Sequence, residues 1–271
     1  MIWRALILAV GTLAYAAGAT AQGTGLRRLT DRDDLLGWEA VGRLELNRQG
    51  FCTGTLIAPE LVLTAAHCVY DRNGKLRPAE QIAFRAGLRD GVAVAERQGL
   101  QIAAHPGFNP RTGLGMENIR HDVALIRLAE PIPSSQADAF ALHSGRDYGS
   151  GISVTSYGMG RAEALSRQRQ CNLMGEHEDV LMIDCNVTFG SSGAPVFSFE
   201  GERPRIVSVV SAKARVEGSA VSLGASLADE LALLEAQLTG AHVGSRMPQG
   251  VGRVQVGEPR RNDLGAKFIS N

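Results

Sequence analysis

Short stretches of alternating or continuous apolar residues recur through most of this chain, and turn residues separate them. Asn73-Gly74, Asp90-Gly91 and Pro106-Gly107 mark such turns, and the chain contains 32 glycines. Apolar runs of this length, bounded by Gly, Pro and Asn, are typical of β-strands. We expect strands at residues 41–46, 52–57, 61–64, 82–88, 96–104, 123–128, 153–157, 180–185, 194–199, 206–214 and 220–223.

This succession predicts an all-β fold. Many short strands with regular turns favour barrels or a sandwich. A parallel α/β sheet needs crossover helices between its strands, and we find no convincing helical pattern there. One helix is expected after the last strand. Its apolar residues fall on one face and Gly240 ends it, so we interpret it as a packing helix: Leu227, Leu231, Leu234 and Leu238.

The amino terminus has the pattern of a targeting segment. Arg4 precedes an apolar run at residues 5–17 that is too short to span a bilayer. Ala19-Thr20-Ala21 then has the small residues of a cleavage site. We expect residues 1–21 to be a signal peptide cleaved near Ala21, which predicts a secreted or periplasmic protein. An uncleaved membrane anchor is the alternative.

Four cysteines remain after such cleavage: Cys52, Cys68, Cys171 and Cys185. An exported chain reaches an oxidising compartment, where disulfides persist. Three pairings are possible. The sequential pairing closes two loops of roughly 15 residues, each worth about 3 kcal/mol in the chain-entropy model. Free buried thiols are the alternative, and the absence of a C-x-x-C motif argues against zinc.

The balance of charge excludes some functions. Lys and Arg together number 28, as do Asp and Glu. Nothing in this balance indicates a nucleic-acid or membrane-surface partner. We find no motif for a metal or a cofactor, and we expect neither.

The stretch TFGSSGAP at residues 188–195 carries the most specific chemistry. Glycines around Ser192 allow a substrate backbone to approach closely. Successive amides in such a loop can point at one spot and bind an anion. A nucleophilic serine with an oxyanion hole needs both properties. Alone the stretch is weak evidence, because turns rich in Gly and Ser are common.

Two further segments strengthen this interpretation. LTAAHC at residues 63–68 places His67 at the end of an apolar strand, and HDVALIRL at residues 121–128 places Asp122 at the start of another. With Ser192, the chain order is His, Asp, Ser. The segments TAAHC, HDVALIRL and GSSGAP together resemble the signature segments of chymotrypsin-like, or trypsin-fold, serine endopeptidases. Their details resemble bacterial exported members, including glutamyl-endopeptidase-like ones.

The resemblance implies two antiparallel six-stranded β-barrels with a C-terminal helix. The first barrel would span residues 37–131, and the second barrel with the helix would span residues 132–240. Residues 22–36 would be a linker or a short pro-segment, and residues 241–271 a disordered, mildly basic tail. Disulfides Cys52–Cys68 and Cys171–Cys185 are then expected. We expect a monomer that acts on protein or peptide substrates.

The resemblance also implies residue roles. Ser192 would attack the scissile carbonyl, His67 would transfer its proton, and Asp122 would orient His67. The amides of Gly190 and Ser192 would form the oxyanion hole. His121 is expected to face away from Asp122 as a structural residue. The other histidines match no motif, and we expect them at the surface: His105, His143, His177 and His242.

The substrate pocket is implied by position. Asn186 would form its base, with Val187 beside it, and Ser211, Ala212 and Lys213 would form the edge that pairs with substrate. Asn186 supplies no carboxylate, so we predict poor cleavage after Lys or Arg. Small, apolar or acidic side chains are the preferences we expect. Lys213 would attract an acidic side chain, narrow the pocket, or point to solvent.

The residue before the nucleophile departs from the trypsin-like pattern. Trypsin-like zymogens have an aspartate there, which pairs with a newly freed amino terminus. Ser191 has no charge to pair with a buried ammonium. We therefore expect local hydrogen bonds and Cys171–Cys185 to hold the oxyanion loop. Chains beginning at Gln22, Leu29 or Gly37 should then have comparable kcat once folded.

Two other functions are consistent with parts of the sequence. An α/β-hydrolase esterase uses G-x-S-x-G with the order Ser, acid, His. Here Ala194 replaces the last glycine, and only His242 follows Ser192. A catalytically inactive trypsin-fold binding protein is the second alternative. Intact His67, Asp122 and Ser192 argue against it.

Overall fold

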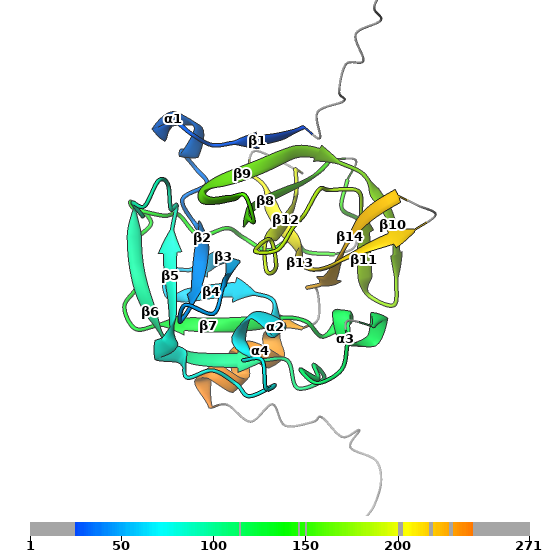
Figure 1. Cartoon of the computed structure of the whole chain (residues 1–271), viewed down its shortest axis with the longest axis horizontal. Helices are drawn as coiled ribbons and strands as arrows, with labels where there is room; N and C mark the ends of the chain where they lie inside the picture. Colours follow the sequence, from blue (N-terminus) through cyan, green and yellow to red (C-terminus); the bar gives the residue numbers. More distant parts are fainter. Residues whose placement is uncertain are drawn as a thin grey trace, which may run out of the picture. The chain divides into compact units, whose positions relative to one another are not determined.

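The computed structural model describes residues 25–240, apart from 114, 146, 150, 200–202, 217–218 and 228–229. Within this part the strands form two antiparallel β-sheets (Figure 1). The expected signal peptide and C-terminal tail lie outside the described residues.

The first sheet is a closed six-stranded barrel, as expected. Buried and partly exposed residues alternate along residues 42–46 and 82–86, whereas residues 51–58 and 61–64 include runs of consecutive buried residues. Large apolar side chains such as Leu44, Leu56 and Phe84 are fully buried. Around the barrel the strands are β2 (Val41–Leu46), β3 (Phe51–Ala58), β4 (Leu61–Thr64), β7 (Ala124–Leu128), β6 (Ala95–Ala104) and β5 (Ile82–Ala86).

The second sheet contains eight strands, where six were expected. Two of the strands that the sequence pattern missed, β9 and β10, are rich in polar residues. Because β9 buries Ser166 and Gln168, it does not show a clear apolar alternation. The order across the sheet is β1 (Leu26–Arg28), β9 (Arg161–Cys171), β8 (Ile152–Gly158), β12 (Pro195–Ser198), β13 (Arg205–Val216), β14 (Ser219–Ser226), β11 (Val180–Ile183) and β10 (Leu173–His177).

The expected linker at residues 22–36 forms ordered structure from Gly25 onward. Strand β1 pairs antiparallel with β9, and the short helix α1 (Arg32–Leu35) follows. Leu29 and Leu35 are each only 5% exposed. Two buried leucines therefore anchor a segment whose charged residues hid any period.

The described helices are short except the last one. They are α2 (Ala66–Val69), the 3₁₀ turn η1 (Ala79–Gln81), α3 (Met116–Arg120) and α4 (Leu231–Thr239). Helix α4 buries Leu231, Leu234 and Leu238, and Gly240 ends it with φ 66°. The sequence grouped this helix with the second barrel, but it packs against β6 and β7 of the first barrel.

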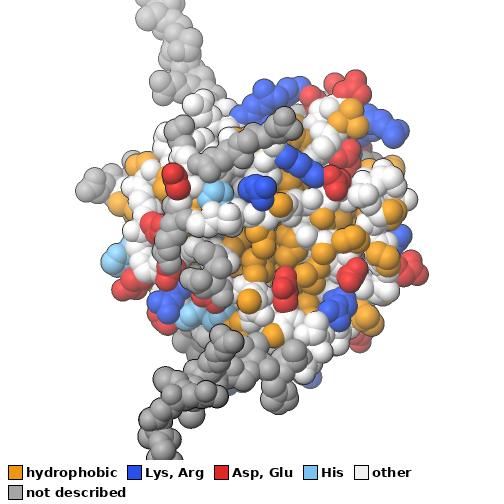
Figure 2. All heavy atoms as spheres, turned by 180° about the vertical axis from the view of Figure 1, so that it is seen from behind, with side chains coloured by type: hydrophobic (Ala, Val, Ile, Leu, Met, Phe, Trp, Pro, Cys, Tyr) orange, Lys and Arg blue, Asp and Glu red, His pale blue; other side chains and the backbone are white. Residues whose placement is uncertain are grey.

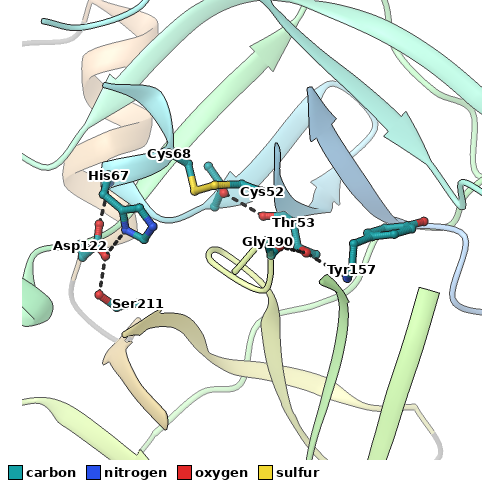
Figure 3. The surroundings of a disulfide bond; sticks show 9 residues. Cys52, Thr53, His67, Cys68, Asp122, Tyr157, Gly190 and Ser211 are labelled. Carbon is teal, nitrogen blue, oxygen red and sulfur yellow. Dashed lines mark hydrogen bonds and ion pairs between the residues drawn. A yellow bond between two sulfur atoms is a disulfide. The ribbon is translucent and has the colours of Figure 1, made fainter. Parts of the chain in front are cut away.

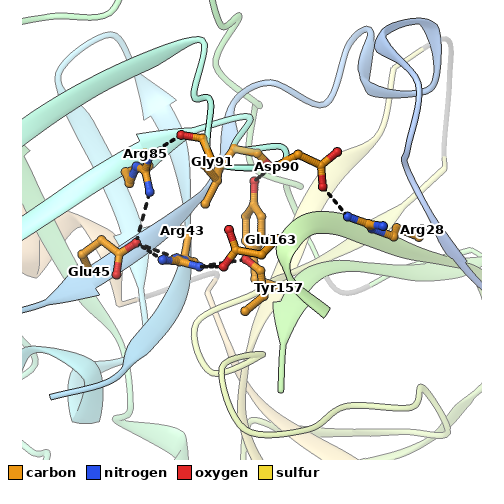
Figure 4. A network of polar contacts seen from close by, with 10 residues as sticks. Arg28, Arg43, Glu45, Arg85, Asp90, Gly91, Tyr157 and Glu163 are labelled. Atoms are coloured by element: carbon orange, nitrogen blue, oxygen red, sulfur yellow. Dashed lines mark hydrogen bonds and ion pairs between the residues drawn. The ribbon is translucent and has the colours of Figure 1, made fainter. Parts of the chain in front are cut away.

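Aromatic and charged residues connect the two sheets. Trp38 and Phe140 pack on Phe197 of β12, with ring centroids 5.3 and 4.6 Å away. Arg43 of β2 reaches across to Glu163 of β9 at 3.0 Å, as Figure 4 shows. These contacts fix β9 and β12 relative to the first barrel.

Charged side chains of both signs are interspersed on the face shown in Figure 2, around a central apolar area. This arrangement agrees with the balanced charge of the sequence.

Candidate active site

Both expected disulfides are confirmed. Cys52 of β3 is bonded to Cys68 of α2, with Cα atoms 6.2 Å apart. Cys171 and Cys185 form the second bond, with Cα atoms 5.2 Å apart. Helix α2 begins two residues after β4 ends, so the first disulfide holds the turn that carries His67 against the neighbouring strand.

Asp122 lies fully buried beside this turn. His67 Nδ1 is 2.7 Å from Asp122 Oδ2, and the His67 amide donates to Oδ1 at 2.8 Å. The hydroxyl of Ser211 also donates to Oδ2. Because an ionised carboxylate only accepts hydrogen bonds, the Nδ1 atom of His67 carries a proton. Three donors therefore satisfy a carboxylate that is 0% exposed (Figure 3).

This arrangement changes the basicity of His67. Burial of the ring lowers its pKa, but the charge of Asp122 and its hydrogen bond outweigh that effect. The pKa of His67 is consequently raised above its ordinary value of 6.5. With Nδ1 protonated, the other ring nitrogen, Nε2, is the one that can accept a proton.

Ser192 lies on a loop between β11 and β12, and backbone hydrogen bonds hold this loop in place. The Thr53 amide donates to the carbonyl of Ser192 at 2.9 Å. Within the loop, the amides of Ser191, Gly193 and Ala194 donate to Thr188, Val210 and Ser191 respectively. By contrast, the amides of Gly190 and Ser192 donate no hydrogen bond to any described residue. Among residues 190–194, the two amides proposed for the oxyanion hole are thus the two that have no described hydrogen-bond acceptor.

The direction of these amides follows from their carbonyl partners. Met159 donates to the carbonyl of Phe189 at 2.7 Å, and Ala194 donates to that of Ser191 at 3.0 Å. In a trans peptide the N–H points opposite to the C=O. The amides of Gly190 and Ser192 consequently point away from these partners.

Close contacts with the first barrel explain why positions 190 and 193 of the loop hold glycine. A Cβ on Gly193 would lie 2.1 Å from Thr64 Oγ1 and 2.8 Å from the Ala65 amide, at φ +75°. A Cβ on Gly190 would lie 2.1 Å from the ring of Phe51, at φ +90°. Any larger residue at either position would push the loop away from the first barrel.

Thr53 joins the loop to both sheets, and the sequence analysis did not identify it. Its hydroxyl donates to the carbonyl of Gly190 at 2.8 Å and accepts from the Tyr157 amide at 3.1 Å. Thr53 is 0% exposed, and Figure 3 shows it across the disulfide from His67. The only sequence signal was a threonine in a strand of mostly apolar residues, and Thr55 on the same strand has the same signal.

The expected pocket residues differ in their surroundings. Asn186 is exposed, and its backbone N–H donates to Gln168 Oε1 at 2.7 Å. Val187 is buried, and its carbonyl accepts from Lys213 Nζ at 3.4 Å. The Lys213 side chain therefore reaches the segment that carries Asn186.

Ser211 contributes to the site through a different atom from the one expected. The register between β13 and β14 shifts between Val210 and Ala212, so Ser211 lies at an irregularity. Such bulges redirect a side chain. The Ser211 side chain contacts Asp122, which leaves its backbone and that of Ala212 as the groups that could meet a substrate.

His105 was expected at the surface, and that expectation is wrong, since it is 7% exposed. Its ring stacks on the ring of His121 with a centroid distance of 4.5 Å. Gly107 donates to His105 Nδ1 at 3.1 Å, so Nε2 carries the proton and lies 2.5 Å from Glu230. A protonated nitrogen offers no lone pair to a metal, and the geometry supports a structural cluster.

The sequence profile of the trypsin family matches residues 34–222. The chain belongs to the trypsin family. Family members that it resembles include human serine protease 56, 36% identical over 95 residues. Brachyurin of Leptuca pugilator is 31% identical over 124 residues. These alignments cover 35% and 45% of the chain, and 14% and 50% of the relatives. The chain thus spans half or less of the length of these relatives.

A solved structure shares the family fold. It is described as Glu endopeptidase in complex with MPD, with a TM-score of 0.63 and 17% sequence identity. The match covers 80% of this chain and 96% of that one. At this sequence identity the match shows that the two chains share a fold, and it shows nothing further.

Proposed function

We propose that this chain is a serine endopeptidase with a catalytic triad of His67, Asp122 and Ser192. The observation that carries the proposal is the hydrogen bond from His67 to the buried Asp122, beside a loop whose Gly190 and Ser192 amides have no described acceptor. Membership of the trypsin family supports it.

In the proposed reaction, Ser192 Oγ attacks the scissile carbonyl and His67 Nε2 accepts its proton. Asp122 holds the tautomer and stabilises the imidazolium that forms. The Gly190 and Ser192 amides donate to the oxyanion of the tetrahedral intermediate. His67 then protonates the leaving amine, and water hydrolyses the acyl-enzyme on Ser192.

Replacement of the nucleophile tests this proposal. Ser192→Ala and His67→Ala should each lower kcat by about 10⁶-fold, and the double variant by little more, because the residues act as a unit. Ser134→Ala, at an exposed position between β7 and β8, is the matched control. Wild-type activity in Ser192→Ala, or additive losses in the double variant, would contradict the triad.

The residues of the expected pocket argue against cleavage after Lys or Arg. Asn186 offers no carboxylate, and the cationic Lys213 reaches the adjacent segment. We therefore expect poor cleavage after Lys or Arg, with small, apolar or acidic residues preferred. Profiling on a peptide library, with Ser192→Ala as the blank, measures this preference. A profile dominated by Lys and Arg would contradict the pocket assignment.

We also propose export to an oxidising compartment. The two disulfides support it, since such bonds persist outside the cytosol. None of the helices in the described part of the chain is both long and apolar enough to cross a membrane. Amino-terminal sequencing of the purified protein tests cleavage near Ala21.

A non-catalytic binding protein of the same fold is the second candidate. A fluorophosphonate probe separates the two, because it labels only an activated serine. Labelling of wild type but not of Ser192→Ala supports catalysis. Peptide binding without labelling would favour the binding protein.

A further inference from the structure

A partly buried cation lies next to the loop that carries Ser192. Arg161 begins β9, immediately after the hairpin turn from β8, and its side chain extends toward Ser191. Its Nη2 atom donates to Ser191 Oγ at 3.0 Å and to Ser156 Oγ at 2.9 Å. Its Nη1 atom donates to the carbonyl of Ser156.

The surroundings of this guanidinium are unusual for an arginine. Every acceptor that it contacts is a neutral oxygen, and no carboxylate among the described residues pairs with it. Burial lowers the pKa of Arg161 to about 10, so the group remains charged at neutral pH. Partial burial of a charge without a counter-ion costs free energy that hydrogen bonds must offset.

The chain makes space for this side chain. A Cβ on Gly158 would lie 2.9 Å from Arg161 Cζ and 2.7 Å from Thr188 Cγ2. Glycine at position 158 therefore lets the guanidinium pass between the hairpin and the loop.

Ser191 is the residue through which Arg161 can act. Its hydroxyl donates to the carbonyl of Tyr157 at 3.0 Å and accepts from Arg161 and from the Thr188 amide. The Ser156 hydroxyl also lies 3.3 Å away, so the donor and both acceptor positions of the Ser191 hydroxyl have described partners. Ser191 is 0% exposed and lies between Gly190 and Ser192, so its fixed side chain constrains the peptides on both sides.

The amino-terminal segment is held elsewhere. Strand β1 pairs with β9 through Leu26, Arg27 and Arg28, opposite Gln168, Arg167 and Ser166. Within the described part of the chain, the groups that bond to the Ser191 side chain all belong to residues 156–161 and 188. The positive charge behind the loop thus comes from within the folded sheet.

We propose that Arg161 is a positioning residue that orders the oxyanion hole through Ser191, so that the site assembles on folding without an inserted amino terminus. This inference rests on the proposed function. It assigns to an internal guanidinium the task that a freed terminal ammonium performs in trypsin-like zymogens.

Kinetics of Arg161→Met, compared with Arg161→Lys, test the proposal. Loss of one oxyanion donor costs about 10²–10³ in kcat, so kcat should fall about 10²-fold in Arg161→Met while KM changes little. Arg161→Lys should recover part of the loss. Guanidinium at millimolar concentration should rescue Arg161→Ala. Arg169→Met, an exposed position on the same strand, is the matched control.

Two measurements keep the test decisive if the variant folds poorly or the protein is not a peptidase. Hydrogen exchange of residues 187–194 should be faster in Arg161→Met and unchanged in Arg169→Met, whether or not the protein hydrolyses peptides. Selective blocking of the terminal amine of the wild type should leave kcat unchanged. Failure of the fluorophosphonate probe to label the wild type would instead contradict the proposed function.

Wild-type kcat and exchange in Arg161→Met would overturn the role of Arg161. Loss of activity on blocking the amino terminus would overturn it as well, because it would show that an inserted terminus orders the loop.

Discussion

Asp122 is the residue on which the proposed chemistry of His67 depends most. Its carboxylate accepts from His67 twice and from Ser211 once. Its charge and hydrogen bond are what raise the pKa of His67. A base with a raised pKa is neutral only at higher pH, which sets the acid limb of the pH profile.

Asp122→Asn should move that limb. In the wild type kcat/KM should rise with pH through a pKa above 6.5, because only neutral His67 accepts a proton. Without the carboxylate only the lowering effect of burial remains, so the limb should shift below 6.5 while kcat falls by about 10⁴-fold. A pH series of kcat/KM measures both. Glu117→Gln, at an exposed position on α3, is the control, and an unmoved limb in Asp122→Asn would contradict the coupling.

Thr53 offers a second test at this scale. Thr53→Val leaves the Gly190 carbonyl and the Tyr157 amide without their partner, which costs about 1–3 kcal/mol in unfolding free energy. We expect kcat to fall as well, since the loop loses the hydrogen bond between the Thr53 hydroxyl and the Gly190 carbonyl. Thr53→Ser should retain most of both.

The chain provides a matched control for this change on the same strand. Thr55 is 1% exposed, and its hydroxyl has no hydrogen-bond partner among the described residues. Thr55→Val should therefore be neutral or stabilising. Chemical denaturation of the variants compares them, and equal losses at positions 53 and 55 would contradict the role of the Thr53 hydroxyl.

At the scale of elements, β9 is the strand that organises the loop from residue 186 to residue 193. Its first residue, Arg161, holds Ser191, and Gln168 accepts from the Asn186 amide. Its far end carries Cys171, bonded to Cys185. One strand thus contacts the loop segment at the expected pocket base, at the residue before Ser192, and through a disulfide.

Strand β1 covers the outer edge of β9, which gives a prediction about truncation. A chain beginning at Gly37 loses the burial of Leu29 and Leu35, worth about 1.5–3 kcal/mol for each side chain. We expect a lower Tm than for a chain beginning at Gly25, but a similar kcat for the folded fraction. Thermal unfolding and active-site titration separate the two effects. An unchanged Tm would show that β1 contributes little.

For the molecule as a whole, the relative placement of the two sheets matters because the proposed triad draws on both. His67 and Asp122 come from the first barrel, whereas Ser192 lies between β11 and β12 of the second sheet. Tyr157 of β8 spans the junction, since its hydroxyl donates to the carbonyl of Leu88 at 3.0 Å. Nearby, Arg43 connects Glu45 with Glu163, and Arg28 pairs with Asp90 (Figure 4).

Tyr157→Phe should weaken this junction. It leaves a buried carbonyl without its donor, so we expect a loss of about 1–3 kcal/mol in unfolding free energy. Tyr70→Phe is the control, because the Tyr70 hydroxyl makes no hydrogen bond to a described residue. Denaturant titration measures both variants. An equal effect at the two positions would show that the Leu88 contact does not stabilise the junction.

Local pattern was sufficient for the strands of the first barrel, because each is a short run with alternating or continuous apolar residues bounded by turn residues. It was also sufficient to locate the segments of His67, Asp122 and Ser192, because each motif lies within a few residues. The cysteine spacing left three pairings open, and the resemblance to the serine endopeptidases selected the pairing that the structure shows. The strands β1, β9 and β10 were missed, since their polar or charged side chains obscure the apolar period.

Only the tertiary structure identified Thr53, Arg161 and Gln168 as supports of the loop. Thr53 bonds to a carbonyl 137 residues away, and Arg161 to a hydroxyl 30 residues away. A polar residue in a strand has no local pattern that names its partner, because hydrogen bonds between sheets depend on how the chain folds back on itself. The sequence by itself therefore determined the family and the expected chemistry, while the packing of two sheets decided which residues hold that chemistry in place.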